Sequence, residues 1–172
     1  MEVNLDNLSP DMIRTIWIML AARVVIWLFY ANAVRKLLLV ISAENRFMKP
    51  AQAWWLAVPF LNIYWNFLVA RNVSNSLNNE FFDRKIAEEE NPGLGKGLMF
   101  AWMFLLSHIP FPTFILLTFF ILGMVYFIQY WVKVTNFKNL LLEHDRVFNQ
   151  NQKPREEAEQ KVLDSTDGED KN

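Results

Sequence analysis

Residues 113–132 read TFILLTFFILGMVYFIQYWV, and none of these twenty residues is Asp, Glu, Lys or Arg. A helix of this length rises about 30 Å, which is the thickness of the hydrocarbon core of a bilayer. Two other windows of twenty residues, 15–34 and 51–70, are almost as apolar and together contain one charged residue, Arg23. The sequence therefore predicts an all-α integral membrane protein.

The charges of the chain lie almost entirely outside its apolar windows. The 172 residues include 17 Lys and Arg and 18 Asp and Glu, and 34 of these charges fall outside windows 15–34, 51–70 and 97–132. A soluble domain distributes its charges more evenly, because each of its elements has a face in water. The pattern excludes a soluble enzyme. The net charge of −1, without a basic stripe, also excludes a nucleic-acid-binding protein.

Proline positions divide the apolar windows into four membrane-embedded helical segments. We expect the second segment to be kinked or re-entrant at Pro59, because proline removes a backbone hydrogen bond. His108, Pro110 and Pro112 mark the turn of a hairpin formed by the third and fourth segments. The predicted membrane domain covers residues 1–148, with segments at about 12–42, 51–70, 92–108 and 113–148, and a surface amphipathic helix at 71–90. Residues 149–172 are expected to form a disordered charged tail, because they have almost no apolar content.

Lys and Arg near the segment ends predict the side of the membrane on which each loop lies. If all four segments cross, loop 35–49 carries four basic residues and the opposite side carries eight. If residues 51–70 instead enter and return at Pro59, eleven basic residues share one side. The second arrangement obeys the positive-inside rule better, whereas most apolar segments of this length cross. Both arrangements stay open, with the C-terminus and the extended ends of the first and fourth helices in the cytoplasm.

Four polar residues within the apolar segments form a candidate intramembrane cluster: Arg23, Asn62, Asn66 and Gln129. A charge near the middle of a span costs about 2.5–3.5 kcal/mol on insertion scales, so Arg23 should have a polar partner. Asn62 and Asn66 are one helical turn apart and share a face. These residues either line a polar path or join helices through hydrogen bonds.

The sequence contains few residues that could form a catalytic or metal-binding site. The apolar segments contain no Asp or Glu, and the chain contains no cysteine. Its two histidines, His108 and His144, are too few for a metal site. We therefore expect no enzymatic activity, no cofactor and no bound metal.

Residues 54–62 read WWLAVPFLN and contain the pattern W-x3-P-x2-N, from Trp55 through Pro59 to Asn62. This stretch resembles a segment of uncharacterised small bacterial inner-membrane proteins that have about four helices. The resemblance covers about 40 residues and does not include the charged C-terminal extension. It implies a multi-pass protein of the bacterial inner membrane and carries no activity with it.

Two functions remain open at this point. The first is a non-enzymatic accessory or scaffold protein that lies in the lipid bilayer and binds protein partners through its cytoplasmic helix ends and tail. The second is a small transport or permeation protein with a polar path near Arg23, Asn62 and Asn66, since broken helices near the midplane commonly form such sites. A homo-oligomer is compatible with either function.

Overall fold

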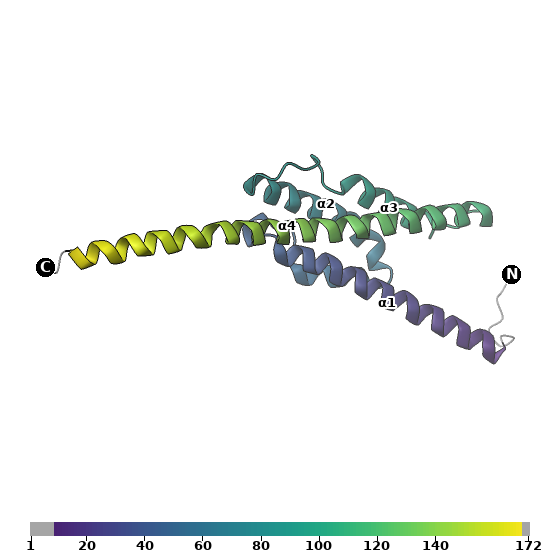
Figure 1. Cartoon of the computed structure of the whole chain (residues 1–172). Coiled ribbons are helices and arrows are strands. Elements are labelled where there is room, and N and C mark those ends of the chain that lie inside the picture. The colour runs from purple at the N-terminus through teal and green to yellow at the C-terminus, as the bar shows by residue number, and fades with distance from the viewer. Residues whose placement is uncertain (1–8, 170–172) are drawn as a thin grey trace.

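The computed structural model describes residues 9–169, and every regular element within them is a helix. The elements are α1 (Pro10–Val40), the 3₁₀-helices η2 (Ala43–Asn45) and η3 (Pro50–Ala57), α2 (Leu61–Asp83), α3 (Leu94–Leu106) and α4 (Thr113–Glu169). Figure 1 shows α4 as a long rod that crosses the other helices and continues well beyond them. The predicted all-α class is confirmed.

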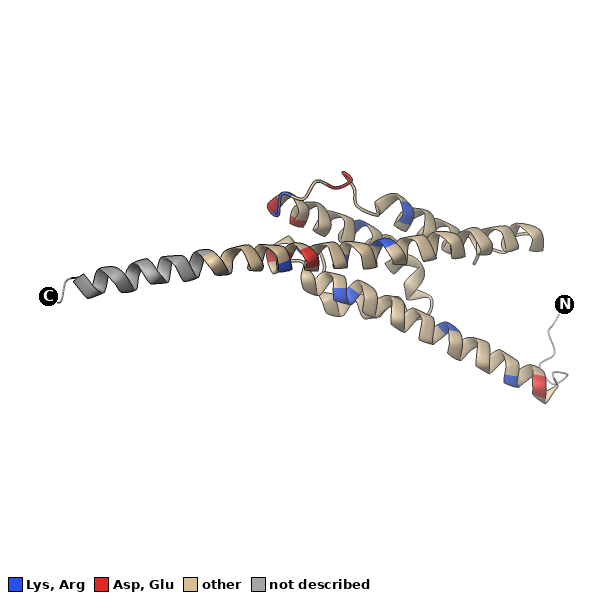
Figure 2. Ribbon diagram, in the orientation of Figure 1, with Lys and Arg blue, Asp and Glu red and all other residues tan. Residues whose placement is uncertain are grey.

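Two of these helices, α1 and α4, contain stretches long and apolar enough to cross a membrane. The apolar helix α3 has 13 residues, which rise about 20 Å and fall short of the hydrocarbon core. Many large side chains of the two long stretches face outward, among them Trp17, Phe29, Phe114 and Ile128. Figure 2 shows no charged residue along the first turns of α4, whereas the start of α1 carries Asp11 and Arg14. The described residues therefore contain two candidate membrane spans, and the four predicted membrane-embedded segments are not all long, apolar helices.

α1 begins where its sequence favours a helix start. Ser9 caps the helix by accepting a hydrogen bond from the Met12 amide at 3.3 Å, Pro10 occupies the first turn, and Asp11 lies near the positive end of the helix dipole. The first buried side chain of α1 is Trp27. The N-terminal half of α1 thus buries no side chain against the described part of the chain.

α1 and α4 run parallel in a constant register. The ring centroids of Trp27 and Phe127 are 5.9 Å apart, and those of Tyr30 and Trp131 are also 5.9 Å apart. Figure 1 shows the two helices diverging toward their N-terminal ends. Phe100 of α3 completes this aromatic core, with ring centroids 5.1 Å from Phe127 and 6.3 Å from Tyr30.

The predicted segment 51–70 is interrupted near its middle. η3 ends at Ala57, and Val58 is extended, with φ −84° and ψ 117°, as a residue before proline prefers. Phe60 then adopts a φ of 64°, and α2 begins at the next residue. The backbone therefore changes direction around Pro59.

α2 continues from Leu61 to Asp83 without a boundary near residue 70, so the predicted surface helix at 71–90 is not a separate element. Its apolar stripe, Val73, Leu77 and Phe81, is at most 4% exposed and belongs to the protein core. Residues 71–83 therefore belong to α2, and their placement at the membrane surface stays a prediction. An apolar stripe indicates that a face is covered, but the same periodicity fits a lipid surface and a neighbouring helix.

The loop after α1 and the end of α2 lie at the same end of the bundle. The Ser42 amide donates to Glu80 Oε2 at 3.0 Å, and the Phe47 amide donates to Ser76 Oγ at 2.8 Å. The chain therefore leaves this end in η3, turns around Pro59 and returns in α2.

α3 and α4 form an antiparallel hairpin whose turn lies between Leu106 and Thr113. Gly93 precedes α3 with a φ of 74°, a conformation that glycine adopts without strain. Gly97 permits the closest helix approach, because a Cβ there would lie 2.8 Å from the Ala70 Cβ and 2.9 Å from the Tyr130 ring. Gly97 thus permits close packing of α3 against α2 and α4.

α4 continues as a helix to Glu169, through most of the predicted disordered tail at 149–172. Helix propagation is less costly than nucleation, and Glu, Gln, Lys, Arg and Ala are good helix formers. The packed part of α4 is already helical, so the helix can extend from it into the polar residues without a new nucleus. The composition of residues 149–172 alone does not indicate this. Residues 170–172 lie outside the described residues.

Candidate functional site

The carboxylate of Glu80, near the end of α2, is buried and makes several hydrogen bonds. Its exposed fraction is 0%. Glu80 accepts hydrogen bonds from the Ser42 amide and hydroxyl, both at 3.0 Å, and from Asn45 Nδ2 at 2.8 Å. A buried carboxylate requires such partners, because an unpaired buried charge is costly. Glu80 therefore fixes the loop after α1 to α2.

Arg84, one turn after Glu80, extends this cluster to a third helix. Its Nε donates to Glu80 Oε1 at 2.7 Å, and its guanidinium also pairs with Asp145 of α4. Further donors reach the Val40 carbonyl at 3.5 Å and the Leu141 carbonyl at 3.3 Å. One guanidinium thus joins the ends of α1 and α2 to the middle of α4, and we call Ser42, Asn45, Glu80, Arg84 and Asp145 the Glu80 cluster.

The hydrogen bonds of the Glu80 cluster favour the charged form of Glu80. Burial by itself raises the pKa of this carboxyl, but hydrogen bonds from Asn45, Ser42 and Arg84 outweigh burial and lower the pKa below its ordinary value. A lowered folded-state pKa means that this stabilisation is complete above the ordinary carboxyl pKa. It is lost as the pH falls through the folded-state value.

A second ion pair ties the loop before α3 to α4. Glu89 pairs with Lys133 and also accepts the Gly93 amide at 2.8 Å, and the hydrogen bond from Lys133 lowers the pKa of Glu89. Lys96 of α3 donates to Gln129 Oε1 at 2.6 Å. Gln129 is therefore paired with the start of α3 and makes no hydrogen bond with Arg23 in the described part of the chain.

Arg23 is paired with a residue that the sequence analysis assigned to the hairpin turn. Its Nη2 lies 3.4 Å from His108 Nε2, and its guanidinium carbon lies 6.0 Å from the centre of the Phe104 ring. The Arg23 side chain is exposed and makes no hydrogen bond with Asn62 or Asn66 among residues 9–169. Pro110 and Pro112 follow His108 in the exposed turn.

Asn62 and Asn66 are both buried, as a shared helix face predicts. Asn66 has no hydrogen-bond partner for either Nδ2 or Oδ1 within the described residues, although both atoms are buried. The structure thus places the four predicted cluster residues in three separate surroundings: Arg23 with His108, Gln129 with Lys96, and the two asparagines inside α2. It does not join them into one polar path.

The polar contacts of the Glu80 cluster hold the ends of α1 and α2 against α4. The Glu80 carboxylate accepts hydrogen bonds from Ser42, Asn45 and Arg84, all of which are protein groups. Among the described residues, no group of three or more His, Asp and Glu side chains is placed to hold a metal ion. The geometry of the Glu80 cluster thus positions the ends of α1 and α2 against α4.

The sequence analysis did not identify Glu80 or Arg84 as site residues. Their spacing of four residues is a signal of an ion pair on one helix face, but exposed helices show the same spacing. The informative detail is that Glu80 follows Val73 by seven residues and Leu77 by three, and therefore lies on the same apolar helix face. A carboxylate on such a stripe predicts a buried and paired acid.

No protein-family model, curated protein or solved structure matches this chain. The resemblance of WWLAVPFLN to small bacterial inner-membrane proteins therefore stays a prediction.

Proposed function

We propose that this chain is a non-enzymatic, multi-pass membrane accessory protein that holds a helical rod rigidly at the cytoplasmic membrane surface for partner proteins. One observation carries the proposal. α4 contains an apolar candidate span followed by a polar extension, and the Glu80 cluster holds α4 at Leu141 and Asp145, just beyond the apolar stretch 113–132. The apolar stretches of α1 and α4 expose large side chains, which suits contact with lipid.

The proposed topology is the re-entrant one. α1 crosses the bilayer. η3 and the start of α2 enter it and turn back around Pro59. α3 and the turn at 107–112 then lead to the far side, and α4 crosses back. Support comes from the Glu80 cluster, which gathers the loop after α1, the end of α2 and residues 141–145 at one end of the bundle. Eleven of the basic residues then share the cytoplasmic side, in agreement with the positive-inside rule.

Single cysteines test this topology, because the natural sequence has none. Glu44→Cys and Asn91→Cys alter exposed loop residues outside the Glu80 cluster, and Thr113→Cys reports on the opposite end. In oriented vesicles, an impermeant thiol reagent is expected to label positions 44 and 91 from the same side and position 113 from the other. Labelling of 44 and 91 from opposite sides would mean that residues 51–70 cross, and would overturn the topology.

The partner-binding part of the proposal needs a separate test. Truncation after residue 148 removes the end of the rod and leaves the Glu80 cluster intact. Affinity purification of the full chain and of the truncated chain from the same membranes is expected to recover different partner proteins. Identical sets of partners would contradict a scaffold that acts through α4.

The alternative function, small-molecule permeation, has one observation in its favour: the unpaired buried amide of Asn66. Intramembrane polar groups without protein partners commonly face water or a substrate. Flux of small polar solutes through liposomes containing the chain, compared with its Asn66→Leu variant, tests this alternative. A flux that the substitution abolishes would favour permeation over the accessory function.

A further inference from the structure

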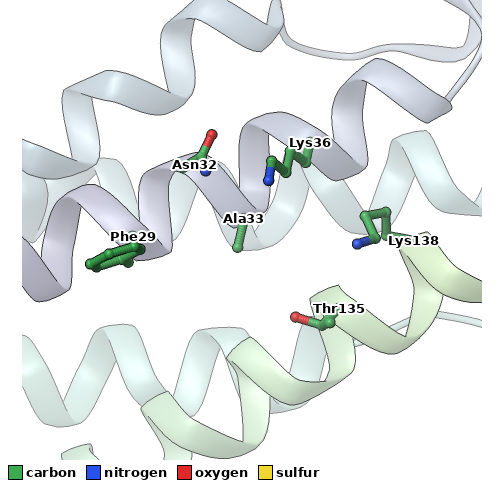
Figure 3. Close-up of a pocket in the computed structure, with 6 residues that line it drawn as sticks. All are labelled: Phe29, Asn32, Ala33, Lys36, Thr135 and Lys138. Atoms are coloured by element: carbon green, nitrogen blue, oxygen red, sulfur yellow. The ribbon is translucent and has the colours of Figure 1, made fainter.

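A groove between α1 and α4 carries two lysines, Lys36 and Lys138. It has a volume of about 210 Å³ and is lined by Phe29, Asn32, Ala33, Lys36, Thr135 and Lys138. Figure 3 shows Lys36 on α1 and Lys138 on α4 on opposite sides of the groove, with Thr135 beside them. Among the described residues neither lysine pairs with a carboxylate.

A second, more apolar hollow adjoins this groove. It has a volume of about 350 Å³, shares Thr135 with the first, and is also lined by Ile128, Trp131, Val132 and Asn136. Ile128, Val132 and Thr135 lie on one face of α4, since they are separated by four and three residues. The two hollows together form a continuous track along α4, from apolar side chains to a lysine.

The parallel register of α1 and α4 gives this track a polarity. On α1, Phe29 precedes Lys36 by seven residues, and on α4, Ile128 precedes Lys138 by ten. Both helices thus become basic in the same direction, toward the end of the bundle that holds the Glu80 cluster. Lys36 follows the apolar window of α1, and Lys138 follows that of α4, so the lysines lie at headgroup depth if the two stretches cross the bilayer.

We propose that this groove binds an anionic phospholipid, with its phosphate between Lys36 and Lys138 and an acyl chain along Ile128, Trp131 and Val132. Basic pockets between membrane helices bind anionic headgroups through this chemistry. Asn32 and Thr135 supply neutral hydrogen-bond donors to the same phosphate. The apolar hollow distinguishes a lipid from a free phosphate, because a free phosphate gains nothing from it. The inference rests on the proposed placement of α1 and α4 in the membrane.

The test uses the full chain reconstituted into vesicles of equimolar phosphatidylglycerol and phosphatidylcholine, extracted in mild detergent and examined by native mass spectrometry. The natural chain is expected to retain phosphatidylglycerol in preference to phosphatidylcholine. Lys36→Gln combined with Lys138→Gln should reduce this preference by about tenfold or more, given about 1 kcal/mol per lysine near an anionic surface.

The matched control is Arg35→Gln combined with Arg146→Gln, which removes two positive charges from the same helices but alters no residue of the groove. This variant should retain the preference, and an equal loss would overturn the site in favour of general surface charge. Displacement of the lipid by inorganic phosphate, but not by chloride at equal ionic strength, would overturn a lipid occupant. Retention of neither lipid would instead contradict the membrane placement itself.

A second measurement tests the apolar part of the site. Phosphatidylglycerol with brominated acyl chains should quench tryptophan fluorescence more than brominated phosphatidylcholine does. This difference should disappear in Trp131→Phe, a conservative change in the apolar hollow. Equal quenching by the two lipids in the natural chain would overturn the proposal.

Discussion

Arg84 and Arg23 lie at opposite ends of the bundle and differ in nearly all their contacts. The side chain of Arg84 is 15% exposed and reaches Glu80, Asp145 and two backbone carbonyls on α1 and α4. The side chain of Arg23 is exposed and has one hydrogen-bonding neighbour, His108 at 3.4 Å, together with the Phe104 ring. One arginine joins three helices, and the other joins two through a long contact.

The spacing between α1 and α4 differs in the same way between the two ends of the bundle. α1 and α4 are held together near Arg84, and they diverge toward the ends where Arg23 and His108 lie (Figure 1). The protein thus fixes one end of the bundle through its own polar contacts and leaves large apolar surfaces uncovered at the other. This division suits the proposed accessory function, in which the proposed cytoplasmic end is rigid and lipid covers the other end.

The largest effect is expected from Arg84→Met. This change leaves Glu80 buried without its cationic partner, and breaking a buried ion pair by removing one side typically costs about 3–5 kcal/mol. Unfolding in mixed detergent with increasing dodecyl sulfate, followed by circular dichroism, measures the loss.

Arg23→Met is the control for that experiment. We expect its unfolding free energy to differ by less than about 1 kcal/mol, because exposed contacts contribute little and the substitution removes a charge from an apolar span. Equal losses for the two variants would mean that both ends of the bundle are clamped to the same degree.

A smaller loss is expected from Gly97→Leu in α3. A Cβ at this position would lie 2.8 Å from the Ala70 Cβ, so the helices must separate, and overpacking of this kind costs about 1–3 kcal/mol. Gly95→Leu is the matched control, because nothing lies within 4 Å of a Cβ there. The same unfolding assay should show a loss for position 97 and almost none for position 95; the reverse order would contradict the observed packing of α3.

The sequence predicts the fold best where one physical signal acts alone. The apolar stretches of α1 and α4 follow from their length and lack of charge, and the break near Pro59 follows from the missing amide of proline. Each of these features depends on residues that are close together in the chain.

The features that were not predicted depend on residues distant in sequence. Glu80 is held by distant residues: Ser42, 38 positions earlier, donates hydrogen bonds to it, and Asp145, 65 positions later, pairs with its partner Arg84. Likewise, Arg23 lies beside His108, 85 residues away, and not beside the asparagines that its chemistry suggested. Spacing within a helix identifies the face of a side chain, but not the element that covers that face.

A gain in stability is expected from Asn66→Leu. An unpaired polar group in the interior costs about 1–3 kcal/mol, and leucine fills a similar volume without that penalty, so the unfolding free energy should rise by about 1 kcal/mol. Asn62→Leu, one turn earlier, is the control and should gain less, since its amide is not among the fully buried unpaired groups. A loss at position 66 would show that its amide has a water or ligand partner, which is what the permeation alternative requires.

The smallest effect is expected from Glu89→Gln and depends on pH. Because the hydrogen bond from Lys133 lowers the pKa of Glu89, this pair stabilises the folded state above the ordinary glutamate pKa, and its contribution is lost as the pH falls through the folded-state value. Glu89 is 43% exposed, so the loss at neutral pH should stay below about 1 kcal/mol. Unfolding curves of the natural chain and Glu89→Gln should therefore differ slightly at pH 7 and converge in acid. A difference that persists in acid would mean that Glu89 acts through its packing or its bond to the Gly93 amide, and that the charge of the pair contributes nothing at this exposed end of the loop.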